Sequence, residues 1–173
     1  MRSFFVFFFN IVVILILIAF GGLLLPSKVT VTKSVLINAS PKKAAAQIND
    51  FDNWATWYPA LQNKKVSVTG NTPKTNVLQS IALKDDNGKQ IDLHLIQSSP
   101  DSINIEVKSQ SSTKVFYQFL LIPHDNGKTQ LTLNVNAYFE WYPWEKVKGI
   151  FLDKISGPQY ESALLKLKEA AEK

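Results

Sequence analysis

The sequence predicts an α+β domain in which a curved antiparallel sheet of about seven strands wraps a long C-terminal helix. Residues 64–139 alternate between apolar and polar side chains, with turn-forming residues between the runs, as in consecutive β-hairpins. Residues 143–173 instead repeat their apolar side chains every three or four positions, which is the period of an amphipathic helix. Because a sheet with one apolar face must cover that face, we expect the helix to lie on it. The predicted order is one strand, two short helices, six strands and the long helix.

A separate apolar segment precedes this domain. Phe4–Leu25 is 22 residues long and contains one strongly polar side chain, Asn10. As a helix it would extend roughly 33 Å, enough for the hydrocarbon core of a bilayer. We therefore predict a single transmembrane anchor over residues 1–27, with the membrane contacted by residues 4–25, and a folded domain over residues 28–173. A cleaved signal peptide is the alternative, but its apolar region would be unusually long.

Charge predicts the side of the membrane on which the domain lies. Arg2 precedes the apolar segment, which favours a cytoplasmic N-terminus and an extracytoplasmic domain. A folded domain can cross despite its own charges, so we predict a membrane protein with an extracytoplasmic domain. The opposite orientation is favoured by four lysines that follow the segment: Lys28, Lys33, Lys42 and Lys43.

The domain is predicted to begin with one strand and two short helices. Val29–Ile37 alternates apolar and polar residues, as a half-buried strand does. Ser40 is suited to cap the first helix and Asp50 the second. Pro59 is expected to end the second helix, because the residue before a proline avoids the helical conformation.

Six strands follow, separated by turn signals. Asn87-Gly88 and Asn126-Gly127 are the strongest of these signals, because the favoured two-residue hairpin turns need positive φ at both central residues. The six predicted strands are Lys64–Thr69, Lys74–Leu83, Lys89–Gln97, Ser102–Ser109, Thr113–Ile122 and Lys128–Phe139.

The long helix is predicted over Pro143–Lys173, with a break inside it. Ser156 can cap a second helical segment, and Pro158 is tolerated in a first turn because no backbone donor is needed there. Side chains alone do not usually fill the space between a strongly curved sheet and so long a helix. We therefore expect a cavity between them.

The composition argues against several classes of site. The chain of 173 residues has no cysteine, which removes thiolate nucleophiles and Cys-ligated zinc. Arg2 is the only arginine, and the formal charge of +5 comes from scattered lysines, which argues against nucleic-acid binding. His94 falls on the polar face of its strand and His124 in a turn, so neither indicates a metal site. We predict no metal, no cofactor and no nucleic-acid partner.

Catalytic groups are not indicated either. The sequence has no Gly-x-Ser-x-Gly motif and no glycine loop for phosphate. Asp50 and Asp52 are better explained as capping residues than as a catalytic pair. Glu140 and Glu145 flank an aromatic run, and a partly buried glutamate at a cavity mouth remains a candidate base. We predict no catalytic residue and favour a protein that is not an enzyme.

Aromatic residues form two groups with different expected roles. Trp54 and Trp57 are predicted to pack in the core, as large aromatic side chains usually do. For Trp141, Tyr142 and Trp144 two interpretations stay open. They either pack in the core or lie at the mouth of the cavity or at lipid headgroup level beside the anchor.

Three stretches of the chain resemble a known superfamily: Val31–Pro41, Ile48–Pro59 with its Asp-x-x-x-Trp-x-x-Trp-x-Pro pattern, and Gly149–Lys154 with Gly157 and Leu164–Lys168. They are similar to the opening strand, the second helix and the final helix of the START-like (SRPBCC) superfamily. This group includes the polyketide cyclase/dehydrase-like proteins and the birch-pollen-allergen fold. The resemblance covers Val29–Lys173 and implies a helix-grip fold. The N-terminal segment fits the membrane-anchored bacterial members.

The resemblance implies a cavity for lipids, sterols, polyketides or other apolar molecules, although the matched motifs are structural. We therefore predict a membrane-tethered domain that binds a hydrophobic or amphipathic, lipid-like molecule. The alternatives are a polyketide cyclase/dehydrase-like enzyme and a ligand-free protein-interaction module at the membrane. The predicted cavity residues, among which Tyr117 and Tyr138 would supply polar groups, are Trp57, Tyr117, Phe119, Leu133, Val135, Tyr138, Trp141, Phe151 and Ile155.

Overall fold

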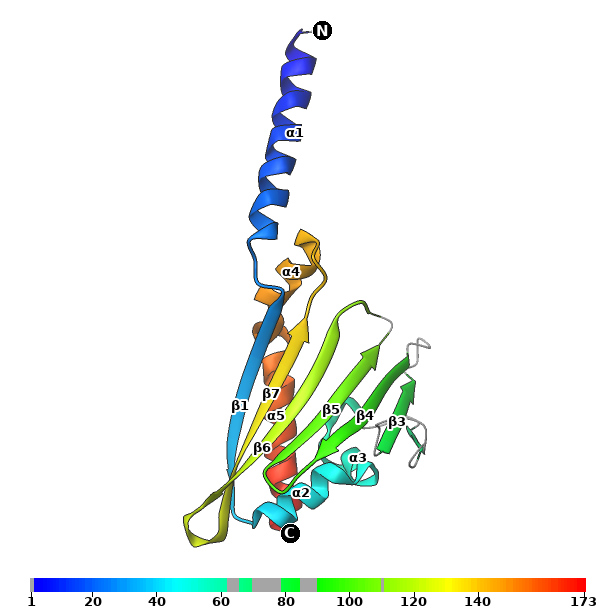
Figure 1. The fold of residues 1–173 in the computed structure, drawn as a ribbon, viewed down its shortest axis with the longest axis vertical. Coiled ribbons are helices and arrows are strands. Elements are labelled where there is room, and N and C mark those ends of the chain that lie inside the picture. The colour runs from blue at the N-terminus through cyan, green and yellow to red at the C-terminus, as the bar shows by residue number, and fades with distance from the viewer. Residues whose placement is uncertain (1, 62–65, 70–78, 85–89, 110) are drawn as a thin grey trace.

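The computed structural model of the chain describes residues 2–61, 66–69, 79–84, 90–109 and 111–173. One antiparallel sheet curves around a long C-terminal helix, and a further helix extends away from one end of the domain (Figure 1). The N-terminus lies at the tip of that extended helix, and the C-terminus lies at the opposite end of the molecule. The predicted α+β class is confirmed.

The extended helix is α1 (Arg2–Leu23), which corresponds to the apolar segment. Its helical conformation agrees with the prediction, but its crossing of a membrane is not confirmed. Among the residues that the structure describes, no helix is both long enough and apolar enough to cross a membrane.

The first strand and the short helices follow α1 as predicted. The Ser40 side chain accepts a hydrogen bond from the backbone N–H of Lys43, and the Asp50 carboxylate accepts one from the N–H of Asp52 at 3.0 Å. Both residues therefore have the capping roles that their side chains suggest. The elements are β1 (Lys28–Ile37), α2 (Pro41–Asn49), η1 (Phe51–Asn53), α3 (Trp54–Trp57) and η2 (Pro59–Leu61).

All seven strands in the described part of the chain belong to one sheet in the order β1-β7-β6-β5-β4-β3-β2, and every neighbouring pair is antiparallel. After β1, each strand pairs with the next in the sequence, so β2 to β7 form a meander. β1 pairs with β7 and completes one edge. The strands after β1 are β2 (Val66–Thr69), β3 (Gln79–Lys84), β4 (Gln90–Ser98), β5 (Ser102–Ser109), β6 (Lys114–His124) and β7 (Lys128–Tyr138).

The turn between β6 and β7 has the geometry that its sequence predicts. Asn126 has a φ of 60° and Gly127 a φ of 71°, within a short helical turn, η3 (Asp125–Gly127). Asparagine and glycine are the residues that adopt positive φ at least cost. The other strong turn signal, Asn87-Gly88, lies outside the described residues.

The long C-terminal helix differs from the prediction in the position of its break. The chain forms α4 (Pro143–Ile150) and α5 (Leu152–Glu172). Phe151 lies between them, with a φ of −94° and a ψ of 0°. The predicted break at Ser156 and Pro158 is wrong, because α5 continues through both residues. An interior proline costs roughly 3 kcal/mol. Burial of the following turns of α5 against the sheet offsets that cost.

The core lies between the inner face of the sheet and the helices α2, α3 and α5. Trp54 and Trp57 are completely enclosed, and their indole N–H groups donate to the backbone oxygens of Ile48 and Gln47, at 2.9 and 3.2 Å. The predicted packing role of these two tryptophans is confirmed. The outer face of the sheet is polar, and its side chains bond across strands in the pairs Thr30–Asn136, Thr32–Asn134 and Ser34–Thr132.

Candidate ligand-binding site

The inner face of the sheet is where the sequence places the candidate site. Five of the nine predicted cavity residues are buried there or in the neighbouring helix α3, and they form part of one apolar cluster. Their position between sheet and helices agrees with the expected arrangement, whereas their contact with a ligand stays a prediction. These five residues are Trp57, Tyr117, Phe119, Leu133 and Val135.

The other four predicted residues lie elsewhere. Phe151 is 49% exposed and Ile155 is 71% exposed, so they do not face the sheet across the core. The helical register explains this difference, because residues such as Tyr160, Leu164 and Leu167 occupy the inward face of α5. Tyr138 lies on the outer side of β7 and contacts Phe116, and Trp141 is exposed before α4.

Three tyrosine hydroxyl groups meet inside this apolar region. The hydroxyl of Tyr58, which follows α3, lies 3.0 Å from that of Tyr117 on β6. Tyr160 on α5 packs edge-on against Tyr117 with 5.9 Å between ring centroids, and the two phenol groups interact electrostatically. Ser156, four residues before Tyr160 on α5, acts against the effect of burial on the pKa of Tyr160. Helix, turn and sheet therefore each supply one member of what we call the tyrosine cluster, Tyr58, Tyr117 and Tyr160.

Burial determines the protonation state of the tyrosine cluster. It raises the pKa of Tyr58 to about 12, although the hydrogen bond with Tyr117 acts in the opposite direction. Burial is also the main cause that holds the pKa of Tyr117 well above its usual value and raises the pKa of Tyr160. The phenol groups therefore stay protonated at neutral pH. They can donate or accept hydrogen bonds, but they do not act as anionic bases.

The inner face of the sheet is less completely buried toward the end of the domain that carries α1 and α4. Ile105 and Phe119, near the middle of the sheet, are fully buried. Val107 and Val115, which face each other closer to that end, are only partly buried, as are Ile91 and Leu152. We call these four residues the open rim. The tyrosine cluster lies deeper in the same interior, since Tyr117 is two residues along β6 from Val115.

Sequence reasoning included Tyr117 among the candidates but did not include Tyr58 or Tyr160. The alternation along β6 places Tyr117 on the inner face, which is why it could be identified. Tyr160 begins the apolar stripe of α5, and this position was an available signal for an inward side chain. The convergence of the three hydroxyl groups depends on how α3 and α5 pack, which no local pattern records.

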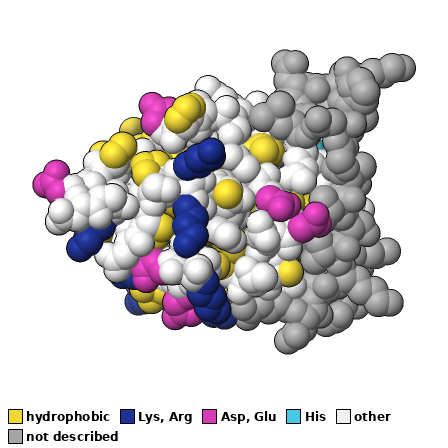
Figure 2. Space-filling view, turned by 90° about the horizontal axis from the view of Figure 1, so that it is seen from below, with side chains coloured by type: hydrophobic (Ala, Val, Ile, Leu, Met, Phe, Trp, Pro, Cys, Tyr) yellow, Lys and Arg dark blue, Asp and Glu magenta, His cyan; other side chains and the backbone are white. Residues whose placement is uncertain are grey.

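A pocket adjoins the tyrosine cluster, and two larger hollows lie elsewhere. The adjoining pocket has a volume of 130 Å³ and is lined by Tyr58, Pro59, Gln159 and Tyr160. A groove of 840 Å³ runs between α2 and the turn from β4 to β5, where Ser98 donates to Asn49. That groove lies at the end of the molecule opposite α1, where basic, acidic and apolar side chains are intermixed on the surface (Figure 2).

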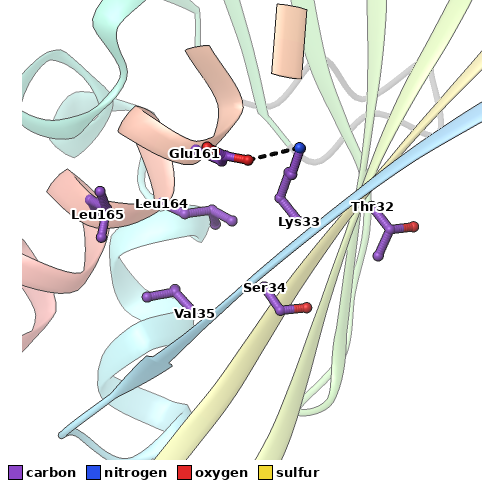
Figure 3. Close-up of a pocket in the computed structure, with 7 residues that line it drawn as sticks. All are labelled: Thr32, Lys33, Ser34, Val35, Glu161, Leu164 and Leu165. Atoms are coloured by element: carbon purple, nitrogen blue, oxygen red, sulfur yellow. Dashed lines mark hydrogen bonds and ion pairs between the residues drawn. The ribbon is translucent and has the colours of Figure 1, made fainter. Parts of the chain in front are cut away.

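The other hollow is a groove of 370 Å³ between β1 and α5 (Figure 3). Lys33 points from β1 toward α5, and its Nζ atom lies 2.7 Å from Glu161 and 3.1 Å from Asp153. The hydrogen bond to Glu161, followed by the one to Asp153, raises the pKa of Lys33. We interpret the two ion pairs as a structural contact between α5 and the edge strand β1, because the lysine and the two carboxylates neutralise one another.

Other titratable groups do not assemble into a second centre within the described residues. No group of three His, Asp or Glu side chains there is close enough to hold a metal ion. His94 is only partly exposed on the outer face, and its Nδ1 atom is buried without a hydrogen-bond partner among the described atoms. Glu145 is buried at the base of α4, where its Oε1 atom accepts a hydrogen bond from Lys148 at 2.6 Å. It lies outside the tyrosine cluster.

Comparison with solved structures supports the fold. The Zhui aromatase/cyclase from Streptomyces sp. R1128 matches with a TM-score of 0.63 and 14% identity, covering 84% of this chain and 94% of that one. Protein SA2116 of unknown function from Staphylococcus aureus matches with a TM-score of 0.65 and 16% identity, covering 84% of this chain and 94% of that one. The di-domain ARO/CYC StfQ from the steffimycin biosynthetic pathway matches with a TM-score of 0.64 and 13% identity, covering 84% of this chain and 51% of that one. At such identities the likeness shows the fold alone.

No curated protein sequence matches the chain. A protein family does, over nearly the whole domain. Its match begins with β1 and ends with the last turn of α5, so it includes every element that forms the inner face described above. Residues 28–172 match the family described as "Polyketide cyclase / dehydrase and lipid transport", and the chain belongs to that family.

Proposed function

We propose that the domain binds a hydrophobic or amphipathic, lipid-like small molecule between the inner face of the sheet and α5. The observation that carries this proposal is the tyrosine cluster, a set of protonated hydroxyl groups inside an otherwise apolar interior. Ligand sites commonly combine apolar walls with a few polar groups that fix orientation. The partly buried open rim supports a route to this interior from the α4 end.

The expected ligand follows from these groups. Its apolar body would contact residues such as Val107, Val115 and Leu152, which are apolar and incompletely covered. A single hydroxyl, carbonyl or carboxyl group would exchange hydrogen bonds with the tyrosine cluster, which can act as donor or acceptor. No described cationic side chain joins the cluster, so a neutral polar group is favoured over a strongly charged one.

We also propose that α1 tethers the domain to a membrane, with the domain on the extracytoplasmic side. The apolar stretch over residues 4–25 and the projection of α1 away from the domain support this part of the proposal (Figure 1). The orientation rests on Arg2, the basic residue before α1. A thiol-reactive probe that cannot cross membranes tests the orientation in intact cells, with cysteine placed at exposed Glu169 in the naturally cysteine-free chain. Labelling before lysis is expected, and labelling only after lysis would reverse the orientation.

Native mass spectrometry of the full chain in detergent, followed by extraction of bound molecules, tests ligand binding. We expect a stoichiometric apolar molecule whose retention falls about tenfold in Tyr117→Phe, because a lost hydrogen bond is worth about 1 kcal/mol or more. Tyr138→Phe, which removes a hydroxyl group from the outer side of β7, is the matched control. An empty protein that also gains no thermal stability from a panel of lipids would overturn the proposal.

A second pair of variants tests the location of the site. Val115→Trp places a large side chain on the open rim and is expected to exclude the ligand. Phe116→Trp adds a similar bulk to the other face of the same strand and is expected to bind normally. If both variants retain the ligand equally, the molecule binds somewhere other than the inner face.

A cyclase/dehydrase-like enzyme is the second candidate. The protonated phenol groups favour it, because a buried hydroxyl group can donate a hydrogen bond or a proton to a substrate carbonyl oxygen. Incubation with short poly-β-keto thioesters, followed by mass spectrometry, distinguishes the two candidates. Loss of water from the substrate that disappears in Tyr117→Phe would support the enzyme, whereas recovery of unchanged substrate would support binding alone. A ligand-free interaction module would show neither binding nor turnover.

A further inference from the structure

Helix α4 is amphipathic, but its orientation is the reverse of that usual for a helix on the surface of a soluble domain. It buries two charged side chains and exposes its apolar ones. Its buried residues are Glu145, Lys146 and Gly149, and the two charged residues are only 9% and 8% exposed. Its apolar residues point outward: Trp144 is 65% exposed and Ile150 is 57% exposed. Soluble domains normally bury the apolar face of a surface helix and expose its charges. The outward face of α4 therefore requires an apolar environment.

The outward apolar side chains form one continuous surface. Trp144, Val147 and Phe151 follow each other at the spacing of one helical face, and Ile150 lies beside them. Exposed Trp141 precedes the helix, and exposed Ile155 lies one turn beyond Phe151, whose backbone oxygen accepts from the N–H of Ile155. We call this surface the α4 stripe: Trp141, Trp144, Val147, Ile150, Phe151 and Ile155. Contiguous exposed apolar surface of this kind marks an interaction site.

One of the buried charges of α4, Lys146, joins the helix to α1. The Nζ atom of Lys146 donates to the backbone oxygen of Leu23 at 3.0 Å, where the last carbonyl groups of α1 lack partners inside the helix. A cation is favourable at that end of a helix dipole. Pro143 packs directly against Gly22, where even a Cβ atom would overlap it. The α4 stripe thus begins where α1 ends, and α1 itself exposes apolar side chains such as Phe20 and Leu23.

We infer that the α4 stripe lies in the headgroup and upper acyl region of a lipid bilayer, next to the end of α1. This inference rests on the membrane tether proposed above. Three observations select a bilayer as the partner: the inverted burial of α4, its fixed junction with an apolar helix, and two tryptophans and a tyrosine at that junction. Tryptophan and tyrosine favour the boundary between headgroups and acyl chains. An amphipathic helix that lies flat in this boundary buries its apolar face.

The arrangement also places the open rim next to the proposed membrane surface. Val115 pairs with Ala137 near the end of β7, and α4 follows β7 after four residues, so the rim and α4 lie at the same end of the sheet. Docking of the α4 stripe would hold that end against the membrane. A lipid-like ligand would then pass between the bilayer and the inner face without crossing water.

Site-directed spin labelling of the full chain in lipid nanodiscs of phosphatidylcholine and phosphatidylglycerol tests the inference. The chain has no cysteine, so single cysteines can be placed by Trp144→Cys and Ile150→Cys, with Glu169→Cys as a control on the exposed face of α5 near the C-terminus. We expect the two labels on the stripe to be several-fold less accessible to a water-soluble nickel complex, and more accessible to oxygen, than the control label. Equal accessibility to the nickel complex at all three positions would overturn the inference.

A label on α1 separates this inference from the proposed tether. If a label introduced by Leu17→Cys contacts lipid while the stripe labels contact water, the tether holds and docking of the stripe fails. If the α1 label contacts water, the tether itself fails. Spin–spin broadening between stripe labels that disappears on dilution with unlabelled protein would instead identify a second copy of the chain as the partner, and would overturn bilayer docking.

Variants test whether the stripe causes the docking. The double variant Trp144→Ser, Ile150→Ser is expected to increase the water accessibility of a label at residue 147 several-fold. Leu165→Ser removes an equally exposed apolar side chain from α5, outside the stripe, and is expected to leave that label unchanged. The same label response in both variants would contradict a specific role for the stripe. Circular dichroism in detergent would establish that both variants remain folded.

Discussion

Helices α4 and α5 follow each other with one residue between them, yet they bury opposite kinds of side chain. Leu164, Leu167 and Ala171 of α5 are enclosed against the sheet, whereas Ile150 and Trp144 of α4 are exposed. Both helices are amphipathic, so the difference is not one of pattern. It lies in what each face contacts: α5 lies on the sheet, and the inward face of α4 lies against β1 and α1. An apolar stripe therefore predicts that a partner exists but not which partner it is.

The strongest test of this comparison makes the same kind of change in both helices. Leu167→Ser is expected to lower the free energy of unfolding by about 3–5 kcal/mol, because it removes a fully buried side chain and leaves a hydroxyl group in a cavity. Ile150→Ser in α4 is expected to change it by about 0.5 kcal/mol or less, because the residue is exposed. Chemical unfolding in detergent measures both. Equal losses would mean that α4 packs against the domain much as α5 does.

A smaller effect is expected where α4 contacts the domain. A Cβ atom on Gly149 would lie 2.8 Å from Phe139 and 2.9 Å from Val29, so Gly149→Ala would force these side chains to move. We expect a loss of about 1–3 kcal/mol, as for other overpacked sites. Gly21→Ala is the matched control, since no atom lies within 4 Å of its Cβ position. Thermal unfolding measures both variants, and a stable Gly149→Ala would show that α4 is held loosely.

The junction between α1 and α4 is expected to be weaker still. Lys146→Met keeps most of the side-chain volume but removes the hydrogen bond to the Leu23 oxygen. We expect a loss of about 1–2 kcal/mol or less, because methionine does not leave a buried charge unpaired. The clearer result should be a broader distance distribution between spin labels on α1 and on the sheet. An unchanged distribution would mean that the contact of Pro143 with Gly22 is sufficient to fix the junction.

The smallest effect at neutral pH concerns the tyrosine cluster beneath α5. The pKa of Tyr58 is about 12 in the folded chain, above its usual value of 10.0. The resulting stability is fully present below pH 10 and decreases as the pH rises from 10 to about 12, because the unfolded chain loses the proton first. We expect the melting temperature of Tyr58→Phe to fall less steeply over this range than that of the unchanged chain. Parallel curves would place the Tyr58 hydroxyl in water.

Much of the fold could be predicted because its signals are local. The alternation along β6 placed Tyr117 and Phe119 on one face, and the structure buries both. The cap at Ser40 and the turn at Asn126-Gly127 depend on only a few adjacent residues, and both occur as expected. The break in the long helix was placed at Pro158 because local propensity favours it, but packing of α5 overrides that propensity and the break occurs at Phe151.

The candidate site could be predicted only in part. Four of the five predicted residues on strands, Tyr117, Phe119, Leu133 and Val135, were placed on the inner face correctly, because a strand has two faces and hydropathy distinguishes them. The fifth, Tyr138, lies on the outer side of β7. Phe151 and Ile155 were assigned inward because they are apolar and lie in the C-terminal helical region, yet both are exposed. Hydropathy identified both residues as apolar. It did not reveal that they lie outside the domain's own core.

The sequence alone determined the α+β class, the antiparallel meander, the apolar segment before it and the family resemblance, because periodicity, turn residues and local motifs are properties of neighbouring residues. Only the tertiary structure decided that Tyr58 after α3, Tyr117 of β6 and Tyr160 of α5 lie together, and that Lys146 of α4 is buried and bonds to the end of α1. These contacts join residues far apart in the chain. They depend on how the helices pack, and helix packing is set by the summed burial of many side chains rather than by any single pattern.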